Sequence, residues 1–285
     1  MQQVSRNKTF GGDIIKYEFV SKSLGGLTTQ MNVFIPPNAS DSAKVPVLYY
    51  LAGLSSTEDN GAQKGNFFAS AAQEGIAIVF PDTSPRGANI PGEDDAYDFG
   101  TSAGFYLNST KAPWSEHYRM FDLVTKEIPE VLVTSSLPID VKRASIMGHS
   151  MGGHGALVSY LKTAEGTYRS ASAFAPISHP TQSPWGTKAF DGYLSGGVEE
   201  GKAWDASLLL AKRSAKATHI YVDCGTADQF YQSGQIQPER LVEAAKEAGV
   251  QDSVLLNMRE GYDHSYFFVS TFGADHVRWH AKFLQ

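Results

Sequence analysis

Short apolar runs alternate with helical patterns along most of the chain. Six runs read as strands that are covered on both faces, and they span 45–53, 76–81, 143–148, 170–176, 219–225 and 253–260. Stretches with the spacing of amphipathic helices cover about 61–74, 114–133, 153–163, 204–215, 238–248 and 266–284. This alternation predicts an α/β fold on a doubly wound sheet with right-handed crossovers.

The N-terminal pattern is different. "IIKYEFV" (14–20) and "MNVFIPP" (31–37) alternate apolar and polar positions and are joined through the turn at Gly25-Gly26. Such segments are typical of antiparallel strands. We therefore expect a mostly parallel central sheet with antiparallel N-terminal strands and with helices on both faces.

Two segments lack periodicity and are rich in turn residues. They cover 82–113 and about 176–203, and each follows the carboxyl end of an expected strand. In a doubly wound sheet ligands bind at that end, so both excursions are expected to shape a pocket. With no repeat and no linker to divide the chain, residues 1–285 are predicted to form a single domain.

Composition narrows the function. The chain has 285 residues, of which 42% are hydrophobic and 19% charged, with a formal net charge of −6. It has no Lys/Arg run, which disfavours nucleic acid as a partner, and its apolar runs fall short of the roughly 18 residues of a membrane span. The single cysteine, Cys224, excludes an intrachain disulfide, and the N-terminus has no apolar segment typical of a secretion signal. These features favour a soluble cytoplasmic protein.

The stretch "SIMGHSMGGHGAL" (145–157) contains a Gly-x-Ser-x-Gly pattern. In a chain with 27 glycines this pattern alone is weak, because an ordinary glycine turn would also produce it. Its position between an apolar run and a helical pattern is what makes it informative. A strand–turn–helix elbow exposes a serine in a strained conformation and needs small residues two positions before and after it. Gly148 and Gly152 meet that requirement, so Ser150 is the candidate nucleophile.

A serine nucleophile needs a base, and in this type of fold the chain order is Ser, acid, His. Seven histidines are out of order, too close to the elbow or within regular elements: His117, His149, His154, His179, His219, His276 and His280. His264 remains. It lies in "REGYDHSYFF", between the last expected strand and the last expected helix, from which an imidazole can reach the elbow.

Two aspartates compete for the role of the acid. Asp223 lies within an expected strand, whereas Asp228 lies a few residues beyond its end, within reach of a histidine on the next loop. We choose Asp228, which would orient His264 and stabilise its imidazolium form. Asp263 adjoins the histidine, and since adjacent side chains diverge, it is expected to shape the loop instead.

The oxyanion hole of such a site comes from two backbone N–H groups. One belongs to the residue after the nucleophile, which is Met151. The other comes from the loop after the strand 45–53, where Leu54 has the required position. Gly53 beside it allows close approach of the backbone.

Beyond these residues, the chain resembles the esterase D family of α/β-hydrolases, the S-formylglutathione hydrolases. The resemblance extends over nearly the whole sequence. It is carried by "LAGLSSTEDN", "PDTSPRG", "DFGTSAGFY", "PWSEHYRM", "IMGHSMGGHGAL", "SAFAPISHP", "PWGTKAFDGYL", "GTADQF" and "GYDHSYFFVSTFGADHVRWHA". Several of these segments are far more specific than Gly-x-Ser-x-Gly.

The resemblance implies an α/β-hydrolase fold and hydrolysis of S-formylglutathione to formate and glutathione through a formyl-serine intermediate, with side activity on short-chain esters. It implies the triad Ser150, Asp228 and His264, in agreement with the order argument, and Leu54 and Met151 as oxyanion donors. It implies no metal and no organic cofactor. Members of the family often form homodimers.

One departure from the family concerns Ser56, where the family commonly has a cysteine linked to sensitivity to thiol reagents or metals. The serine predicts resistance to such reagents, and Cys224 is expected to be a buried core thiol. Trp185 is a candidate wall of a small acyl pocket, although a packing role is equally compatible with its position. Arg86 and Lys188 lie in the excursions and could meet glutathione carboxylates, but structural ion pairs are the favoured interpretation.

Three alternatives remain at this level. A broad short-chain carboxylesterase would use the same triad on oxygen esters. A catalytically silent hydrolase fold could serve as a binding module, although the complete set of catalytic side chains argues against it. A metal hydrolase built on His276 and His280 is the weakest, because two histidines four residues apart on a helix make only part of a site.

Overall fold

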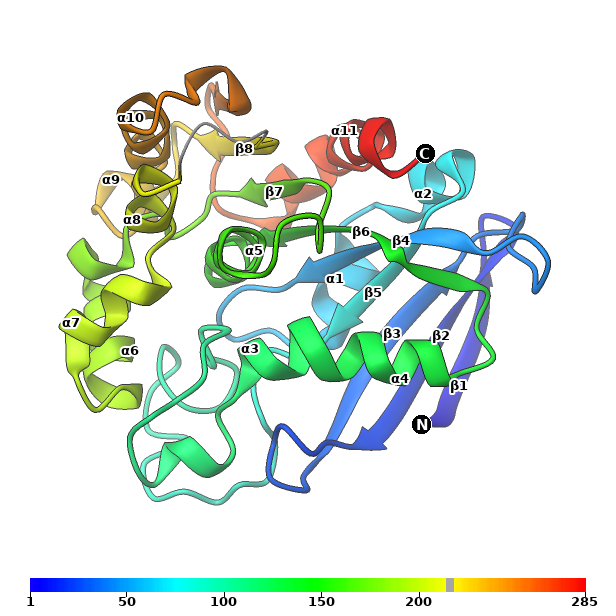
Figure 1. The fold of residues 1–285 in the computed structure, drawn as a ribbon, viewed down its shortest axis with the longest axis horizontal. Helices are drawn as coiled ribbons and strands as arrows, with labels where there is room; N and C mark the ends of the chain where they lie inside the picture. Colours follow the sequence, from blue (N-terminus) through cyan, green and yellow to red (C-terminus); the bar gives the residue numbers. More distant parts are fainter. Residues whose placement is uncertain (214–217) are drawn as a thin grey trace.

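The computed structural model describes residues 1–213 and 218–285, and in these ranges the chain forms an α/β fold around a nine-stranded sheet (Figure 1). The strands are β1 (Gln2–Thr9), β2 (Gly12–Val20), β3 (Thr28–Ile35), β4 (Val45–Leu51), β5 (Ala77–Pro81), β6 (Ile139–His149), β7 (Ala171–Phe174), β8 (Ile220–Gly225) and β9 (Val254–Arg259). Their order is β1-β2-β3-β5-β4-β6-β7-β8-β9. The β1–β2, β2–β3 and β3–β5 pairs are antiparallel, and all the other pairs are parallel. This arrangement confirms the expected fold class.

Helices cover both faces of the sheet. The α-helices are α1 (Glu58–Lys64), α2 (Phe68–Glu74), α3 (Met120–Asp122), α4 (Ile128–Thr134), α5 (Met151–Lys162), α6 (Pro184–Tyr193), α7 (Gly197–Gly201), α8 (Ala206–Ala211), α9 (Gln229–Gln232), α10 (Glu239–Glu247) and α11 (Tyr266–Leu284). Short 3₁₀ or π turns are η1 (Trp114–Glu116), η2 (Leu123–Glu127), η3 (Pro180–Gln182), η4 (Lys202–Trp204) and η5 (Gln251–Ser253). Helices α1, α2 and α11 pack on one face, and α4, α5, α8 and α10 on the other. Figure 1 shows α6 to α10 gathered at the end of the sheet opposite β1–β3. No helix in the described ranges is long and apolar enough to span a bilayer.

The parallel strands end at a common edge. Leu51 of β4 is in register with Gly148 of β6, His149 with Phe174 of β7, and Phe174 with Asp223 of β8. The turns that follow β4, β6, β7 and β8 therefore emerge side by side. This edge is where ligands of such sheets bind.

Strand β1 was not expected from the sequence. Almost all of its residues are exposed, and it is the outermost strand of the sheet. A strand without a buried face shows no apolar alternation, so its pattern does not predict it. It pairs with β2 through a tight turn in which Phe10 and Gly11 both have positive φ.

The expected helix 61–74 is two helices, α1 and α2. Asn66 between them has a φ of 57°, which a helix cannot accommodate. The expected helix 114–133 is also interrupted, since η1 ends before α3 begins at Met120. In the expected helix 204–215, α8 ends at Ala211, and residues 214 and 215 lie outside the described residues.

The two excursions pack against each other. The first excursion, 82–113, holds neither strand nor helix, whereas the second, 176–203, contains α6 and α7. Tyr193 at the end of α6 accepts a hydrogen bond from Gly100 N at 2.7 Å and donates one to Ala103 O at 2.9 Å. Its ring also stacks on Phe99, with centroids 4.4 Å apart. The long loop is thus fastened to α6, and both excursions become fixed walls.

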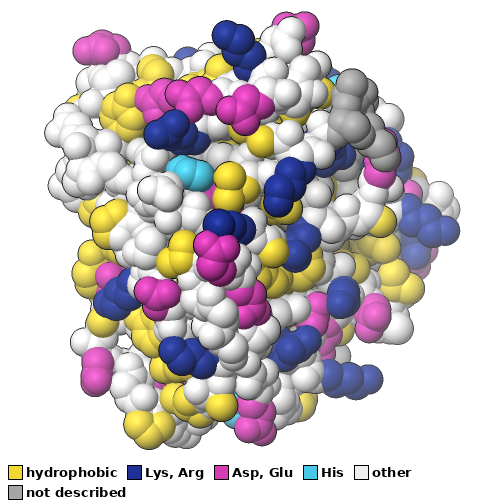
Figure 2. All heavy atoms as spheres, turned by 60° about the vertical axis from the view of Figure 1, so that its left-hand side comes forward, with side chains coloured by type: hydrophobic (Ala, Val, Ile, Leu, Met, Phe, Trp, Pro, Cys, Tyr) yellow, Lys and Arg dark blue, Asp and Glu magenta, His cyan; other side chains and the backbone are white. Residues whose placement is uncertain are grey.

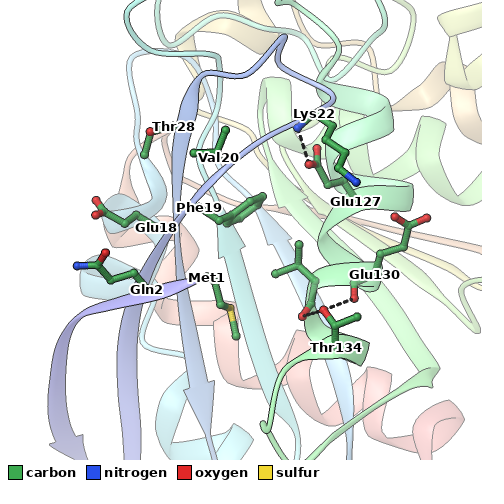
Figure 3. A pocket seen from close by; sticks show the side chains of 11 residues that line it. Met1, Gln2, Glu18, Phe19, Val20, Lys22, Thr28, Glu127, Glu130 and Thr134 are labelled. Atoms are coloured by element: carbon green, nitrogen blue, oxygen red, sulfur yellow. Dashed lines mark hydrogen bonds between the residues drawn. The ribbon is translucent and has the colours of Figure 1, made fainter.

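A hollow of about 560 Å³ lies between the β1–β3 end of the sheet and α4, far along the sheet from the elbow (Figure 3). Its buried carboxylate, Glu127, accepts hydrogen bonds from Ser21 Oγ at 2.6 Å, Lys22 N at 2.7 Å and Ser23 N at 2.9 Å. Burial alone would raise the pKa of Glu127, but these donors lower that pKa below its ordinary value. The carboxylate is occupied in fastening the β2–β3 turn to α4.

We predict that replacing Glu127 with Gln lowers the free energy of unfolding by about 1–3 kcal/mol near neutral pH, because buried donors lose a charged acceptor. Since the folded-state pKa is lowered, the charged group stabilises the fold above the ordinary value of 4.5. That stabilisation is lost as the pH falls below 4.5 through the folded-state pKa. Urea unfolding of the wild type and of Glu127→Gln between pH 3 and 7 measures both effects.

The matched control is Glu130→Gln, in the adjoining helix α4 and exposed. Figure 3 shows both side chains at the same hollow. It should change stability by less than about 0.5 kcal/mol. Equal losses in the two variants would contradict the role assigned to Glu127.

Candidate active site

Ser150 stands between β6 and α5 in a strained backbone conformation. Its φ is 59° and its ψ is −120°, a region that non-glycine residues rarely occupy. The conformation is held by neighbouring backbone, because Ser150 N–H donates to Phe174 O at 2.9 Å and Ser150 O accepts from His154 N at 3.0 Å. The strand–turn–helix context expected from the motif is therefore present, with the side chain directed away from the sheet into a pocket.

The two glycines of the motif are required by close backbone approach. A Cβ on Gly148 would lie 2.1 Å from Gly152 O, and a Cβ on Gly152 would lie 2.0 Å from Leu51 O. Real Cβ atoms do not approach carbonyl oxygens so closely. The pattern around Ser150 is thus a steric requirement of the elbow and of its contact with β4.

His264 lies in the turn between β9 and α11, where the order argument placed the base. Its Nδ1 lies 2.6 Å from Asp228 Oδ2, with Asp228 fully buried and His264 mostly so. The other carboxylate oxygen, Oδ1, accepts hydrogen bonds from Phe230 N at 2.8 Å and Tyr231 N at 3.3 Å. Asp228 is therefore oriented by the start of α9, and the donation from Nδ1–H leaves Nε2 of His264 free to act as a base.

The turn that carries His264 is pressed against the turn that carries Asp228. Ala227 N–H donates to Tyr262 O at 3.0 Å, and a Cβ on Gly225 would lie 2.1 Å from the same oxygen. Gly225 thus permits the close approach of two turns that are separated in sequence by α9, α10, η5 and β9. This approach brings the acid and the imidazole together.

The competing aspartates have other partners. Asp223 of β8 accepts hydrogen bonds from two residues of the neighbouring strand β9, Asn257 at 2.8 Å and Arg259 at 2.9 and 3.1 Å. Asp263 accepts from Ser265 N at 3.0 Å and from Ser265 Oγ at 2.7 Å, which shapes the loop as expected. Neither aspartate makes a hydrogen bond to His264 within the described residues.

A pocket of about 200 Å³ opens at the elbow. Its walls come from the turns after β4, β6 and β9, from both excursions and from α9. The lining residues are Gly53, Leu54, Ser55, Ser56, Tyr97, His149, Ser150, Trp185, Phe230, His264 and Tyr266. The structure therefore brings Ser150 and His264 into one small, largely aromatic cavity.

The turn after β4 lies directly against the elbow. A Cβ on Gly53 would lie only 3.0 Å from Ser150 Cβ, so glycine is required there. Leu54 lines the pocket, and within the described ranges its N–H donates to no protein acceptor. Met151 begins α5, and the first N–H groups of a helix have no acceptor inside the helix. Both expected oxyanion donors are thus placed beside Ser150.

Arg86 holds the turn after β4 in place through hydrogen bonds. Its guanidinium donates to both carboxylate oxygens of Asp82, at 2.9 and 2.6 Å, to Ser102 Oγ at 2.8 Å and to Ser56 O at 3.2 Å. Lys188 likewise forms an ion pair, with Asp98. The structural interpretation of both cations is confirmed, and neither is available as a free anion-binding group.

Trp185 forms one wall of the pocket and is also packed. It is 4% exposed, and its ring lies 4.6 Å from that of Phe230 between centroids. Its Nε1 donates to the hydroxyl of Tyr97 at 3.4 Å, and Tyr97 is largely exposed. The wall role and the packing role expected as alternatives are therefore combined in one side chain.

Besides Ser55, which adjoins Leu54, four pocket residues were not identified from the sequence: Tyr97, His149, Phe230 and Tyr266. His149 directly precedes Ser150, and Tyr266 lies two residues after His264. Their closeness in sequence to the catalytic candidates could have identified them as pocket residues. Tyr97 and Phe230 carried none, because only the folding of the excursion and of α9 brings them to the pocket.

The remaining histidine pair has a structural role. His280 contacts Ser170 Oγ at 2.7 Å and Ser172 Oγ at 2.8 Å, and His276 contacts Ser172 Oγ at 2.8 Å. Both rings are fully buried against the sheet. Among the residues that the structure describes, no group of three or more His, Cys, Asp or Glu side chains is arranged to hold a metal ion.

The lone cysteine is also internal. Cys224 in β8 is fully buried, and burial, reinforced by nearby acidic groups, raises the pKa of its thiol. Ser56, by contrast, lines the pocket and is nearly buried. The position where the resembling family commonly has a cysteine therefore faces the candidate site.

Comparison with known proteins identifies relatives over the full length. The sequence model of the family described as "Putative esterase" matches residues 21–285. The chain is 46% identical over 284 residues to an S-formylglutathione hydrolase of Rattus norvegicus, covering 100% of this chain and 99% of the relative. It is 44% identical to an S-formylglutathione hydrolase of Arabidopsis thaliana, covering 100% and 98%.

Solved structures give the same result. An S-formylglutathione hydrolase from Agrobacterium tumefaciens superposes with a TM-score of 0.94 at 38% identity, covering 100% of both chains. A ferulic acid esterase superposes with a TM-score of 0.72 at 17% identity, which shows a shared fold. The expected resemblance is confirmed, and the chain belongs to the esterase family, among relatives that are S-formylglutathione hydrolases.

Proposed function

We propose that this protein is a serine thioesterase that hydrolyses S-formylglutathione to formate and glutathione. The observation that carries the proposal is the 2.6 Å contact of His264 Nδ1 with Asp228, in a cavity shared with the strained Ser150. Full-length relatives at 44–46% identity bear the name of this activity. In this proposal Ser150 is the nucleophile, His264 the general base and Asp228 the group that orients it.

In the first half-reaction Ser150 Oγ attacks the formyl carbonyl carbon while His264 Nε2 takes the hydroxyl proton. The negative charge develops on the carbonyl oxygen, which the N–H groups of Leu54 and Met151 would stabilise. One such donor is worth roughly 3–4 kcal/mol of transition-state stabilisation in comparable enzymes. Collapse of the tetrahedral intermediate breaks the C–S bond and leaves a formyl-serine.

The leaving group is a thiolate, which departs more readily than an alkoxide because a thiol has a pKa near about 8.5. Protonation by His264 is therefore less demanding at this step than in ester hydrolysis. In the second half-reaction His264 removes a proton from water, and the resulting attack on the formyl carbon releases formate and restores Ser150. These steps use only side chains and backbone of this chain together with water.

The size of the pocket favours a small acyl group. A cavity of about 200 Å³ is smaller than the roughly 300–1,000 Å³ typical of sites that enclose a whole small ligand. We infer that it receives the acyl group, with Trp185 as one wall, and that the glutathione part lies across the mouth. Figure 2 shows acidic and basic side chains interspersed on the face drawn there, so steering by one continuous basic patch is not part of the proposal.

Two further assignments belong with this proposal. The single buried thiol of Cys224 supports the cytoplasm as the compartment, since no disulfide stabilises the chain. The family resemblance is the basis for proposing that the protein acts as a homodimer on a small thioester or ester substrate.

We predict that Ser150→Ala and His264→Ala each lower kcat for S-formylglutathione by about 10⁴-fold or more while the protein stays folded. Asp228→Asn should lower it by about 10³- to 10⁴-fold, because the imidazole loses its orienting carboxylate. Steady-state kinetics, with circular dichroism for folding, measures these effects. Asp263→Asn is the matched control and should retain activity. Full activity in Asp228→Asn would transfer the acid's role to another residue.

We also predict a higher kcat/KM for S-formylglutathione than for p-nitrophenyl acetate. Glutathione thioesters with longer acyl groups retain the glutathione part and enlarge only the acyl group. They should be poorer substrates because the pocket is small. Stopped-flow or spectrophotometric assays of all three substrate types give the comparison. A much better kcat/KM on the aryl ester would instead favour a broad short-chain carboxylesterase.

A third prediction concerns thiol reagents. The wild type should keep its activity in N-ethylmaleimide, because Cys224 is fully buried and the pocket has Ser56 in place of a cysteine. Ser56→Cys should be inactivated by the same reagent, with one mass addition on the peptide that contains residue 56. Rapid inactivation of the wild type, or a resistant Ser56→Cys, would show that these positions are wrongly assigned.

A further inference from the structure

His149 immediately precedes the candidate nucleophile, and no step above uses it. The residue is 6% exposed and its ring lines the pocket. The ring lies 4.6 Å from the His264 ring and 5.6 Å from the Tyr266 ring, measured between centroids. His264 and Tyr266 stand on either side of Ser265, the N-cap of α11. The His149 ring therefore contacts the chain both before and after Ser265.

The His264 ring is enclosed by three different neighbours. His149 covers it at an interplanar angle of 41°, and Phe230 meets it edge-on at 81° with centroids 4.8 Å apart. Asp228 holds Nδ1 at 2.6 Å. The carboxylate alone leaves the imidazole free to swing about this hydrogen bond, and the two aromatic contacts restrict that swing.

His149 is suited to packing rather than to proton transfer. Burial and the nearby His264 lower the pKa of His149 well below 6.5, although a hydrogen bond to the His264 backbone opposes this shift, so the ring is neutral near neutral pH. Its Nε2 is buried and has no hydrogen-bond partner among the described residues. The ring therefore presents an uncharged aromatic face to the imidazole that accepts the proton.

We propose that His149 is a positioning residue, an uncharged aromatic face that holds the His264 imidazole in the orientation required to take the Ser150 proton. The inference rests on the serine-hydrolase function proposed above. It assigns a mechanical task to the position before the nucleophile, which the motif Gly-x-Ser-x-Gly leaves open. A misplacement of about 1 Å in such a site can cost about 100-fold in rate, which sets the scale of the expected effect.

The test compares His149→Ala, which removes the face, with His149→Phe, which keeps the face and removes both nitrogens. We expect His149→Ala to lower kcat by about 100-fold with KM changed by less than about threefold. Pre-steady-state kinetics with p-nitrophenyl acetate should show acylation and deacylation slowed by similar factors, since His264 serves both. His149→Phe should restore kcat to within about fivefold of the wild type.

The control is His219→Ala, which removes an imidazole stacked on Phe283 at 4.4 Å between centroids, outside the pocket. Its kcat should match that of the wild type. Thermal unfolding and titration of Ser150 with a phosphonate inhibitor establish the folded, reactive fraction in each preparation, so that rates are compared per active site.

Three results would overturn the proposal. Unchanged kcat in His149→Ala would show that the face is dispensable. A loss in His149→Phe equal to that in His149→Ala would show that the ring nitrogens matter instead. A rise in KM with kcat preserved would place His149 in substrate binding. If Ser150→Ala and His264→Ala remain active, the serine-hydrolase function itself fails, which is a separate outcome.

Discussion

The steric contact at the elbow is the constraint on which the rest of the site depends. Gly152 approaches Leu51 O, and Gly148 approaches Gly152 O, so closely that a Cβ at either position would overlap an oxygen. This contact joins the end of β4 to the start of α5 and holds Ser150 in a conformation that its own backbone disfavours. A looser turn would relax the serine and withdraw its side chain from the cavity. The strain is supported by the packed parallel strands around it.

A second close approach completes the site. The turn after β8 and the turn after β9 meet where Gly225 contacts Tyr262 O, and this contact brings His264 to Asp228. Each functional group thus follows the carboxyl end of a parallel strand and is held by backbone contacts rather than by long side-chain networks. The excursions then close the cavity, fastened by Tyr193 and braced by Arg86. The proposed role of His149 extends this principle, because it adds an aromatic contact between the elbow and the base turn.

Much of this arrangement was predictable from the sequence, for identifiable reasons. Buried strands and the helices between them have strong periodic patterns, so the parallel sheet and helices such as α11 were expected at nearly their observed bounds. The choice of Ser150, Asp228 and His264 followed from a motif in context and from chain order. The exposed strand β1 was missed because no buried face marks it. Helix 61–74 was expected as one element because the break at Asn66 depends on a single backbone conformation that periodicity does not report.

The sequence by itself determined the fold class, the order of the chemical groups and the family, because these depend on local patterns and on motifs that one chain carries in full. Only the tertiary structure decided which side chains surround those groups. Tyr97, Phe230 and Trp185 come from different parts of the chain, and their meeting in one cavity depends on how the excursions and α9 pack. Likewise, only the packing shows that Arg86 donates to Ser56 O and Ser102 Oγ and that His149 covers His264. Such contacts arise between residues distant in sequence, and no local pattern encodes the distance between them.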